Sequence, residues 1–95
     1  MRYGFRMTLP GVTQEQYDAM HAQFAPLAGA VPGFVAHIAG PTDGGWYVLE
    51  VWESKADHAQ FMQEHVIPNM PPGAPMPNIE EFEVYSRQTK EHPHA

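Results

Sequence analysis

Imidazole, carboxylate and aromatic side chains are the groups in this sequence that could do chemistry, because the chain has no cysteine. Its 95 residues include 6 histidines, 4 tyrosines and 2 tryptophans. A free imidazole titrates near about pH 6.5 and can therefore take or give a proton at neutral pH. We predict that two of the histidines, His37 and His58, are the catalytic base and hydrogen-bonding groups of a pocket.

The surroundings of His37 leave two interpretations open. It lies in a short apolar run, residues 34–38, with the composition of a buried strand. An imidazole in such a run needs a polar partner or must be buried in its neutral form. His37 is therefore either a structural histidine satisfied inside the core or a base that meets a substrate.

A second group of candidates lies on the helix predicted after Ser54. His58, Phe61, Met62 and His65 are spaced at offsets of three, four and seven residues, which return to one helix face. We expect Phe61 to stack on a substrate and Met62 and His65 to line the pocket wall. His58 and His65 are two turns or about 10 Å apart, too far to share one ion, so no metal site is predicted. Alternatively, His65 only interacts with the last carbonyls of the helix.

Three further side chains are predicted to bind a substrate, namely Trp52, Arg6 and Tyr85. Trp52 ends a predicted strand and can stack on a planar ligand or pack in the core. Arg6 can bind an anionic group or join an ion network with carboxylates of neighbouring strands. Tyr85 can donate a hydrogen bond to a phenolate. The carboxylates weighed as partners of Arg6 are Glu50, Glu81 and Glu83.

The first elements that must position these residues are a strand and a helix. Residues 3–9 alternate between apolar and less apolar side chains, which predicts a strand with one apolar face. Thr13 and Gln16 form a capping-box pattern that begins a helix near 13–30. A kink or a restart is expected at Pro26 inside this helix. Its apolar stripe consists of Tyr17, Met20, Phe24, Leu27 and Val31.

The second half of the chain supplies a hairpin, a helix and a last strand. The turn signal Asp43-Gly44-Gly45 separates two strand-like runs, 34–39 and 46–52, and both runs look buried on two sides. Ser54 caps the second helix. An alternating strand follows at 79–85.

This order of elements predicts an α+β, ferredoxin-like βαββαβ fold, in which a four-stranded antiparallel sheet carries both helices on one face. We assign residues 1–88 to this single domain and residues 89–95 to a flexible C-terminal tail. Pro68 is expected to close the second helix. The segment 68–78, with five prolines, is expected either to cover the pocket mouth or only to lead to the last strand.

The second face of the sheet is predicted to be apolar as well. The run 46–52 carries bulky side chains at both its odd and its even positions, so one set must meet water in a lone chain. Burial of apolar area stabilises by about 25 cal/mol per Å². We therefore expect a homodimer that joins through the sheet faces.

The charge balance excludes several partners. Five basic residues against 11 acidic ones give a net charge of −6 without a basic cluster, so neither nucleic acid nor an anionic membrane is an expected partner. The lack of cysteine fits a reducing compartment, and no run is apolar enough to span a membrane. We expect a cytoplasmic protein.

Residues 33–46, the segment Val51-Trp52-Glu53-Ser54 and Phe61 resemble the dimeric α+β barrel superfamily, specifically small proteins similar to antibiotic biosynthesis monooxygenases. The resemblance spans most of residues 3–86. It implies two sheets that face each other across a dimer, with a pocket between each sheet and its helices. It also implies oxidation of polycyclic phenols without flavin, haem or metal, in an apolar cavity that stabilises the phenol anion.

The function implied by this resemblance is cofactor-independent oxygenation of an apolar, aromatic ketone or phenol. In that role His37 and His58 share the base and hydrogen-bond duties. No haem is expected, because the haem-degrading branch usually has a helix tryptophan and a ligand histidine where this chain has Phe61 and Pro71. Two alternatives remain open: a non-catalytic homodimer that binds a hydrophobic metabolite, and a cyclase or isomerase that uses the same histidines without oxygen.

Overall fold

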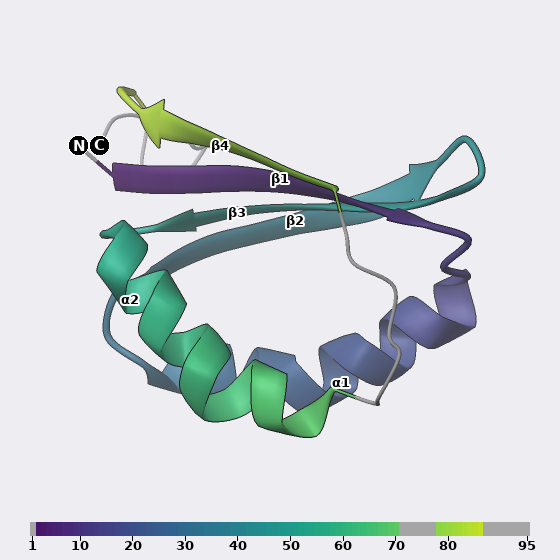
Figure 1. Cartoon of the computed structure of the whole chain (residues 1–95), viewed down its shortest axis with the longest axis horizontal. Coiled ribbons are helices and arrows are strands. Elements are labelled where there is room, and N and C mark those ends of the chain that lie inside the picture. The colour runs from purple at the N-terminus through teal and green to yellow at the C-terminus, as the bar shows by residue number, and fades with distance from the viewer. Residues whose placement is uncertain (1, 71–77, 87–95) are drawn as a thin grey trace, which may run out of the picture.

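The chain folds into an antiparallel sheet that is covered on one face by helices (Figure 1). The computed structural model describes residues 2–70 and 78–86. The strand order is β2-β3-β1-β4, and the predicted ferredoxin-like α+β fold is confirmed. The elements are, in chain order, β1 (Arg2–Pro10), α1 (Gln14–Ala30), β2 (Phe34–Thr42), β3 (Gly45–Trp52), α2 (Lys55–Phe61), the π-helical segment η1 (Met62–Val66), the 3-10 turn η2 (Ile67–Asn69) and β4 (Asn78–Val84).

The register of the strands decides which side chains face the helices. Phe5 of β1 lies opposite Glu50 of β3 and Glu81 of β4, and directly opposed residues share a face. His37 of β2 also lies opposite Glu50. Phe5 is buried in the core that the helices cover, together with Ala28, Trp52 and Phe61. The helix-facing layer therefore includes Glu50, Glu81 and His37.

Helix α1 begins at the predicted capping box. The Thr13 hydroxyl accepts a hydrogen bond from the Gln16 backbone at 3.2 Å, and the Gln16 side chain accepts one from the Thr13 backbone at 3.0 Å. Of the kink or restart expected at Pro26, the restart is wrong, because the helix runs through this residue to Ala30 as one element. The kink stays a prediction. Pro26 is exposed, so the backbone carbonyl that its missing N–H leaves unbonded can meet water.

The apolar stripe of α1 is only partly buried. Ala28 is the buried residue of the helix, whereas Met20 and Leu27 are 38% and 37% exposed. The predicted stripe is therefore buried only in part. The helix rests on the sheet through a few contacts and leaves much of its length in water.

The second helix changes its winding twice. Ser54 caps α2 as predicted, since its hydroxyl accepts a hydrogen bond from the Asp57 backbone at 3.1 Å. The expectation of one helix closed by Pro68 is wrong in detail, because η1 follows α2 and Pro68 lies inside η2. A proline at the start of a helical turn costs no intrahelical hydrogen bond. Single π-helical segments are frequent at functional sites, and η1 carries His65.

The hairpin between β2 and β3 turns at the predicted position, with Gly44 at a φ of +77°. The prediction that both of its strands are buried on two sides is wrong for β2. This strand lies at the edge of the sheet, and Ile38 is 55% exposed. Ile38 lies on the face of β2 away from the helices, and among residues 2–70 and 78–86 this side chain is left largely uncovered.

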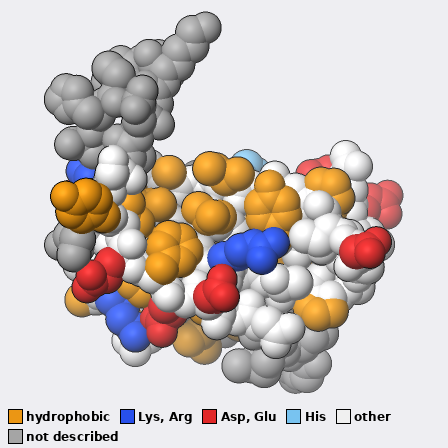
Figure 2. Space-filling view, turned by 90° about the horizontal axis from the view of Figure 1, so that it is seen from above, with side chains coloured by type: hydrophobic (Ala, Val, Ile, Leu, Met, Phe, Trp, Pro, Cys, Tyr) orange, Lys and Arg blue, Asp and Glu red, His pale blue; other side chains and the backbone are white. Residues whose placement is uncertain are grey.

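Apolar side chains gather on the face of the sheet away from the helices, with a few charged side chains among them (Figure 2). This face is called the outer face below, and its largest apolar residues are Ile38, Tyr47, Leu49, Val51 and Phe82. Phe82 lies over Gly4, which has no side chain to keep the ring away. The second apolar face that the sequence predicts is therefore present.

Two predicted segments fall largely outside the described residues. These are most of the cover expected at 68–78 and the whole tail, residues 89–95. Among the helices of residues 2–70, none is long and apolar enough to cross a membrane.

Substitutions at two separate glycines, Gly45 and Gly29, test the packing of the hairpin against β1. A methyl group at Gly45 would collide with the Leu9 backbone carbonyl, whereas one at Gly29 in α1 would have no atom within 4 Å. Gly45→Ala is expected to lower the free energy of unfolding by about 1–3 kcal/mol. The control Gly29→Ala should raise it by about 0.5–1 kcal/mol. Urea denaturation measures both, and a Gly45→Ala protein as stable as the original would contradict this packing.

Candidate functional site

Three side chains from three elements form a hydrogen-bonded chain between the sheet and α1. Glu50 Oε2 on β3 lies 2.7 Å from Nδ1 of His37 on β2. Nε2 of His37 lies 2.6 Å from the hydroxyl of Tyr17 on α1. The His37 and Glu50 side chains are only 23% and 18% exposed. The structure therefore gives His37 the polar partners that its apolar segment requires.

The carboxylate fixes the positions of the protons in this chain. Because a carboxylate accepts hydrogen bonds, the form of neutral His37 that fits both contacts has Nδ1–H donating to Glu50 and Nε2 accepting from the Tyr17 hydroxyl. Burial, together with the negative charges of Glu50 and Asp18, raises the pKa of Tyr17 above its ordinary value of 10.0. Tyr17 therefore keeps its proton at neutral pH. His37 presents an oriented basic nitrogen, as general-base catalysis requires.

Glu50 receives a second hydrogen bond from Trp52. The indole Nε1–H donates to Oε1 at 2.9 Å, so both carboxylate oxygens are satisfied in a half-buried place. The Trp52 ring centroid lies 5.4 Å from those of His58 and Phe61. Trp52 therefore connects the His37 end of the layer to a second cluster around His58.

His58 lies among aromatic rings. Its ring centroid is 4.4 Å from that of Phe5, 5.4 Å from Trp52 and 5.7 Å from Tyr3. Burial lowers the pKa of His58 below its ordinary 6.5, and the charges of Glu50 and Glu81 only partly oppose this effect. His58 is therefore a neutral base at neutral pH.

The rim of the His58 cluster is polar. The Tyr3 hydroxyl donates to Glu81 at 2.7 Å, and Lys55 Nζ lies 3.0 Å from the same carboxylate. Burial and the hydrogen bond to Glu81 raise the pKa of Tyr3 to about 12, while the hydrogen bonds from Tyr3 and Lys55 lower the pKa of Glu81. Tyr3 therefore stays protonated and Glu81 stays ionised near neutral pH.

The rings of Trp52, Phe61 and His65 follow one another, and these three residues are called the aromatic row below. Phe61 is buried, and its ring centroid lies 5.3 Å from that of His65. The backbone carbonyl of His65 accepts a hydrogen bond from the Asn69 side chain at 2.7 Å. Met62 begins η1 and is half-buried. The structure thus places His58, Phe61 and His65 near one another, as their spacing predicts, and Trp52 of β3 lies beside His58 and Phe61.

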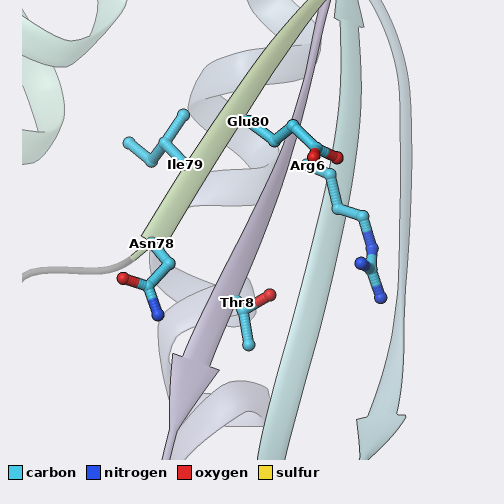
Figure 3. Close-up of a pocket in the computed structure, with 5 residues that line it drawn as sticks. All are labelled: Arg6, Thr8, Asn78, Ile79 and Glu80. Carbon is cyan, nitrogen blue, oxygen red and sulfur yellow. The ribbon is translucent and has the colours of Figure 1, made fainter.

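Arg6 is separated from the histidines by the sheet itself. It lies opposite Leu49 and Glu80, on the outer face, with its guanidinium 5.7 Å from the Tyr47 ring. The predicted ion network with Glu50, Glu81 or Glu83 is wrong, because the register puts these three carboxylates on the helix-facing side. The hollow of about 310 Å³ beside Arg6 is lined by Arg6, Thr8, Asn78, Ile79 and Glu80 (Figure 3).

Tyr85 does not join the histidines either. It follows the end of β4 and is 90% exposed, with no described contact to the aromatic row. The prediction that Tyr85 binds a substrate therefore has no support from the geometry of the helix-facing layer.

Two residues of the site were not assigned to it from the sequence. Tyr17 fits the apolar stripe of its helix, and Glu50 is weighed there only as a partner of Arg6. A signal for Glu50 exists, since it is the charged residue inside the otherwise uncharged run from Trp46 to Trp52. A buried strand that carries one acid predicts a buried donor on a neighbouring strand.

The described residues offer no ready-made metal site. Within 2–70 and 78–86, no group of three or more histidine, aspartate or glutamate side chains gathers as metal binding requires. Phe61 holds the place where the resemblance puts the tryptophan of the haem-degrading branch, and Pro71 lies outside the described residues.

Comparisons with known proteins support the scaffold. No family model matches the chain, and no curated protein sequence matches it. A variant of SnoaB, a cofactor-independent oxygenase from Streptomyces nogalater, is 18% identical over 94% of both chains with a TM-score of 0.60. A variant of MhuD, solved with two manganese protoporphyrin IX molecules per active site, is 23% identical over 90% of this chain and 95% of its own, with a TM-score of 0.53.

These likenesses define the class of fold. The chain has the ferredoxin-like α+β scaffold that SnoaB and MhuD share, which confirms the predicted fold of the single chain. At such identities the comparison establishes the fold alone. The chemistry must be argued from the side chains of this chain.

The lowered pKa of His58 makes stability depend on pH. The unfolded chain takes up a proton at this residue below about pH 6.5, and the folded chain does so only at lower pH. The contribution of neutral His58 to the free energy of unfolding should therefore be complete above about pH 6.5 and be lost as the pH drops towards the folded-state pKa. His58→Phe should show a smaller fall, measured as the urea midpoint between neutral and mildly acid pH.

The matched control is His21→Gln, because His21 lies on the exposed part of α1. It should keep the full dependence on pH. If the urea midpoint falls equally with pH in the original chain and in His58→Phe, His58 is not the source of the pH dependence.

Proposed function

We propose that the chain is a cofactor-independent oxygenase that acts on a flat, apolar phenol bound between its sheet and its helices. The observation that carries this proposal is the Glu50–His37 pair, which holds an imidazole with its basic Nε2 towards α1. Trp52 and Phe61 of the aromatic row beside it are buried in the core and make the surroundings of this pair apolar. The fold likeness to SnoaB, a cofactor-independent oxygenase, supports the same chemistry.

The reaction follows from the proton positions. His37 Nε2 takes the hydroxyl proton of the phenol, and the Glu50 carboxylate stabilises the imidazolium that forms. The phenolate is electron-rich and reacts with dioxygen at a ring carbon. The C–H proton of that carbon passes to His58, which is neutral, and the O–O bond breaks. One oxygen atom stays on the ring as a carbonyl, and the other leaves as water with the two protons taken up by His37 and His58. The ring is oxidised from phenol to quinone and so supplies the four electrons that dioxygen takes up.

The remaining residues of the layer hold the substrate in this proposal. Trp52 and Phe61 stack on its ring, while Met62 and His65 line the wall. Arg6 and Tyr85 have no role, since the first is on the outer face and the second is exposed to water.

We also propose that two copies join through their outer faces. Ile38 and Phe82 are 55% and 38% exposed on this face, and Leu49 lies between them in the sheet. Apolar side chains that gather on one face favour association with a second copy. Such a dimer leaves the helices of both copies outside and the histidine layer of each copy intact.

Oxygen consumption tests the proposed reaction. An oxygen electrode should record uptake when the chain meets one of a panel of polycyclic phenols, and His37→Gln should slow it by about 10²–10⁴-fold through loss of the base. The control Gln63→Ala, at an exposed position of η1, should keep the rate. Binding without any reaction would instead support a non-catalytic binding protein. A product formed without oxygen would support a cyclase or isomerase.

Mass measurement tests the dimer. In dilute buffer, light scattering should give twice the chain mass of 10.6 kDa. Leu49→Arg puts a charge in the middle of the outer face and should shift the protein to the single-chain mass, because an unpaired charge is costly to bury. Met20→Lys, on the exposed side of α1, should leave the dimer unchanged. A single-chain mass for the original protein contradicts the proposal.

A further inference from the structure

Nε2 of His37 already has a hydrogen-bond partner within the chain, the phenol hydroxyl of Tyr17. The Tyr17 hydroxyl lies 2.6 Å from Nε2. Nδ1–H is held by Glu50, so Nε2 is the ring atom that can receive a proton. A substrate hydroxyl can reach this lone pair only when the Tyr17 hydroxyl leaves it.

The ring of Tyr17 lies between other flat rings. Its centroid is 5.4 Å from that of Trp46 and 6.1 Å from that of His37, at interplanar angles of 25° and 26°. Nε1 of Trp46 is buried without a hydrogen-bond partner among the described residues. Buried donors are rarely left unpaired. An acceptor oxygen on a ligand in this place would give the indole its partner.

The half of α1 that carries Tyr17 is weakly attached to the sheet. Every residue from 14 to 23 except Tyr17 is exposed, and the buried residue of the helix, Ala28, lies near its other end. Segments with few buried apolar contacts open locally at low cost in free energy. Tyr17 can therefore withdraw by a turn of its side chain or by a small outward movement of this half of α1.

We propose that Tyr17 occupies the place of the substrate when the site is empty. Its hydroxyl is then hydrogen-bonded to His37, and a flat phenol displaces this hydroxyl on binding. This inference rests on the proposed function, because it takes His37 as the base. The hydrogen bond from Tyr17 to Nε2 breaks and one from the ligand hydroxyl forms; the ligand proton then passes to Nε2. The released Tyr17 hydroxyl bonds to water. The substrate class is thus a flat phenol with a second acceptor oxygen within reach of Trp46.

Binding of 4-nitrophenol tests the displacement. Tyr17→Phe keeps the ring but removes the hydroxyl that competes for His37, so this variant should bind 4-nitrophenol about 3- to 10-fold more tightly than the original chain. Calorimetry on the full chain measures the affinity. The matched control Tyr3→Phe removes a hydroxyl that is bonded to Glu81 instead, and it should leave the affinity unchanged.

The same substitution in a His37→Phe background separates competition from a general loosening of the helix. Without the imidazole there is no hydrogen bond for Tyr17 to lose, so Tyr17→Phe should then change the affinity for 4-nitrophenol less than twofold by the same reasoning. A second probe, 4-nitroanisole, lacks the hydroxyl proton. Tyr17→Phe should prefer 4-nitrophenol to 4-nitroanisole, and the double variant should lose that preference.

A measurement on the unaltered chain needs no variant to fold. The ring protons of Tyr17 feel the ring current of the stacked Trp46, so their NMR signals should move when 4-nitrophenol saturates the protein. Unmoved signals at saturation would overturn the proposal. So would an unchanged or weaker affinity in Tyr17→Phe, an equal gain in the His37→Phe background, or no binding of 4-nitrophenol to either protein.

These outcomes are distinct from those that test the reaction, because no binding experiment involves oxygen. Tighter binding by Tyr17→Phe together with no oxygen uptake from any phenol would contradict the oxygenase proposal and support the displacement of Tyr17. Oxygen uptake together with unchanged binding by Tyr17→Phe would support the oxygenase proposal and contradict the displacement of Tyr17.

Discussion

A half-buried carboxylate, that of Glu50, organises the layer between the sheet and the helices. A negative charge in such a place is costly unless its oxygens receive hydrogen bonds, and here they receive them from Trp52 and His37. Trp52 cannot turn away without leaving one oxygen unpaired, and its ring packs against Phe61 of α2. The other ring nitrogen of His37 is hydrogen-bonded to Tyr17 of α1. Both helices are thus attached to the sheet through the partners of one carboxylate.

Much of the fold could be predicted because its signals are local. The alternation in β1 and the caps at Thr13 and Ser54 depend on residues only a few positions apart. Burial along α1 could not be predicted in the same way. Met20 fits the apolar stripe but is exposed, because burial depends on how the helix rests on the sheet. The π-helical winding at 62–66 also depends on packing around the helix and has no propensity signal of its own.

The site could be predicted only in part, for a reason of register. His37 was identifiable as an imidazole in need of a partner, since its neighbours in sequence are apolar. The partner could not be chosen, because a slip of one residue between strands moves every side chain to the other face. The observed register puts Glu50 opposite His37 and leaves Arg6 on the outer face. The hydroxyl of Tyr17 is hidden from sequence reasoning, since a tyrosine suits an apolar stripe as well as a hydrogen-bonded site.

The two histidines of the layer are suited to different proton transfers because their surroundings differ. A carboxylate stands behind His37 at 2.7 Å, so a proton taken up there forms an ion pair with Glu50. His58 is packed against Phe5 and Trp52, and burial lowers its pKa, so it is neutral at neutral pH. Two titratable groups in contrasting environments are the usual basis for dividing acid and base roles. Trp52 contacts both environments, through its N–H at Glu50 and its ring at His58, so a movement of this side chain would disturb both.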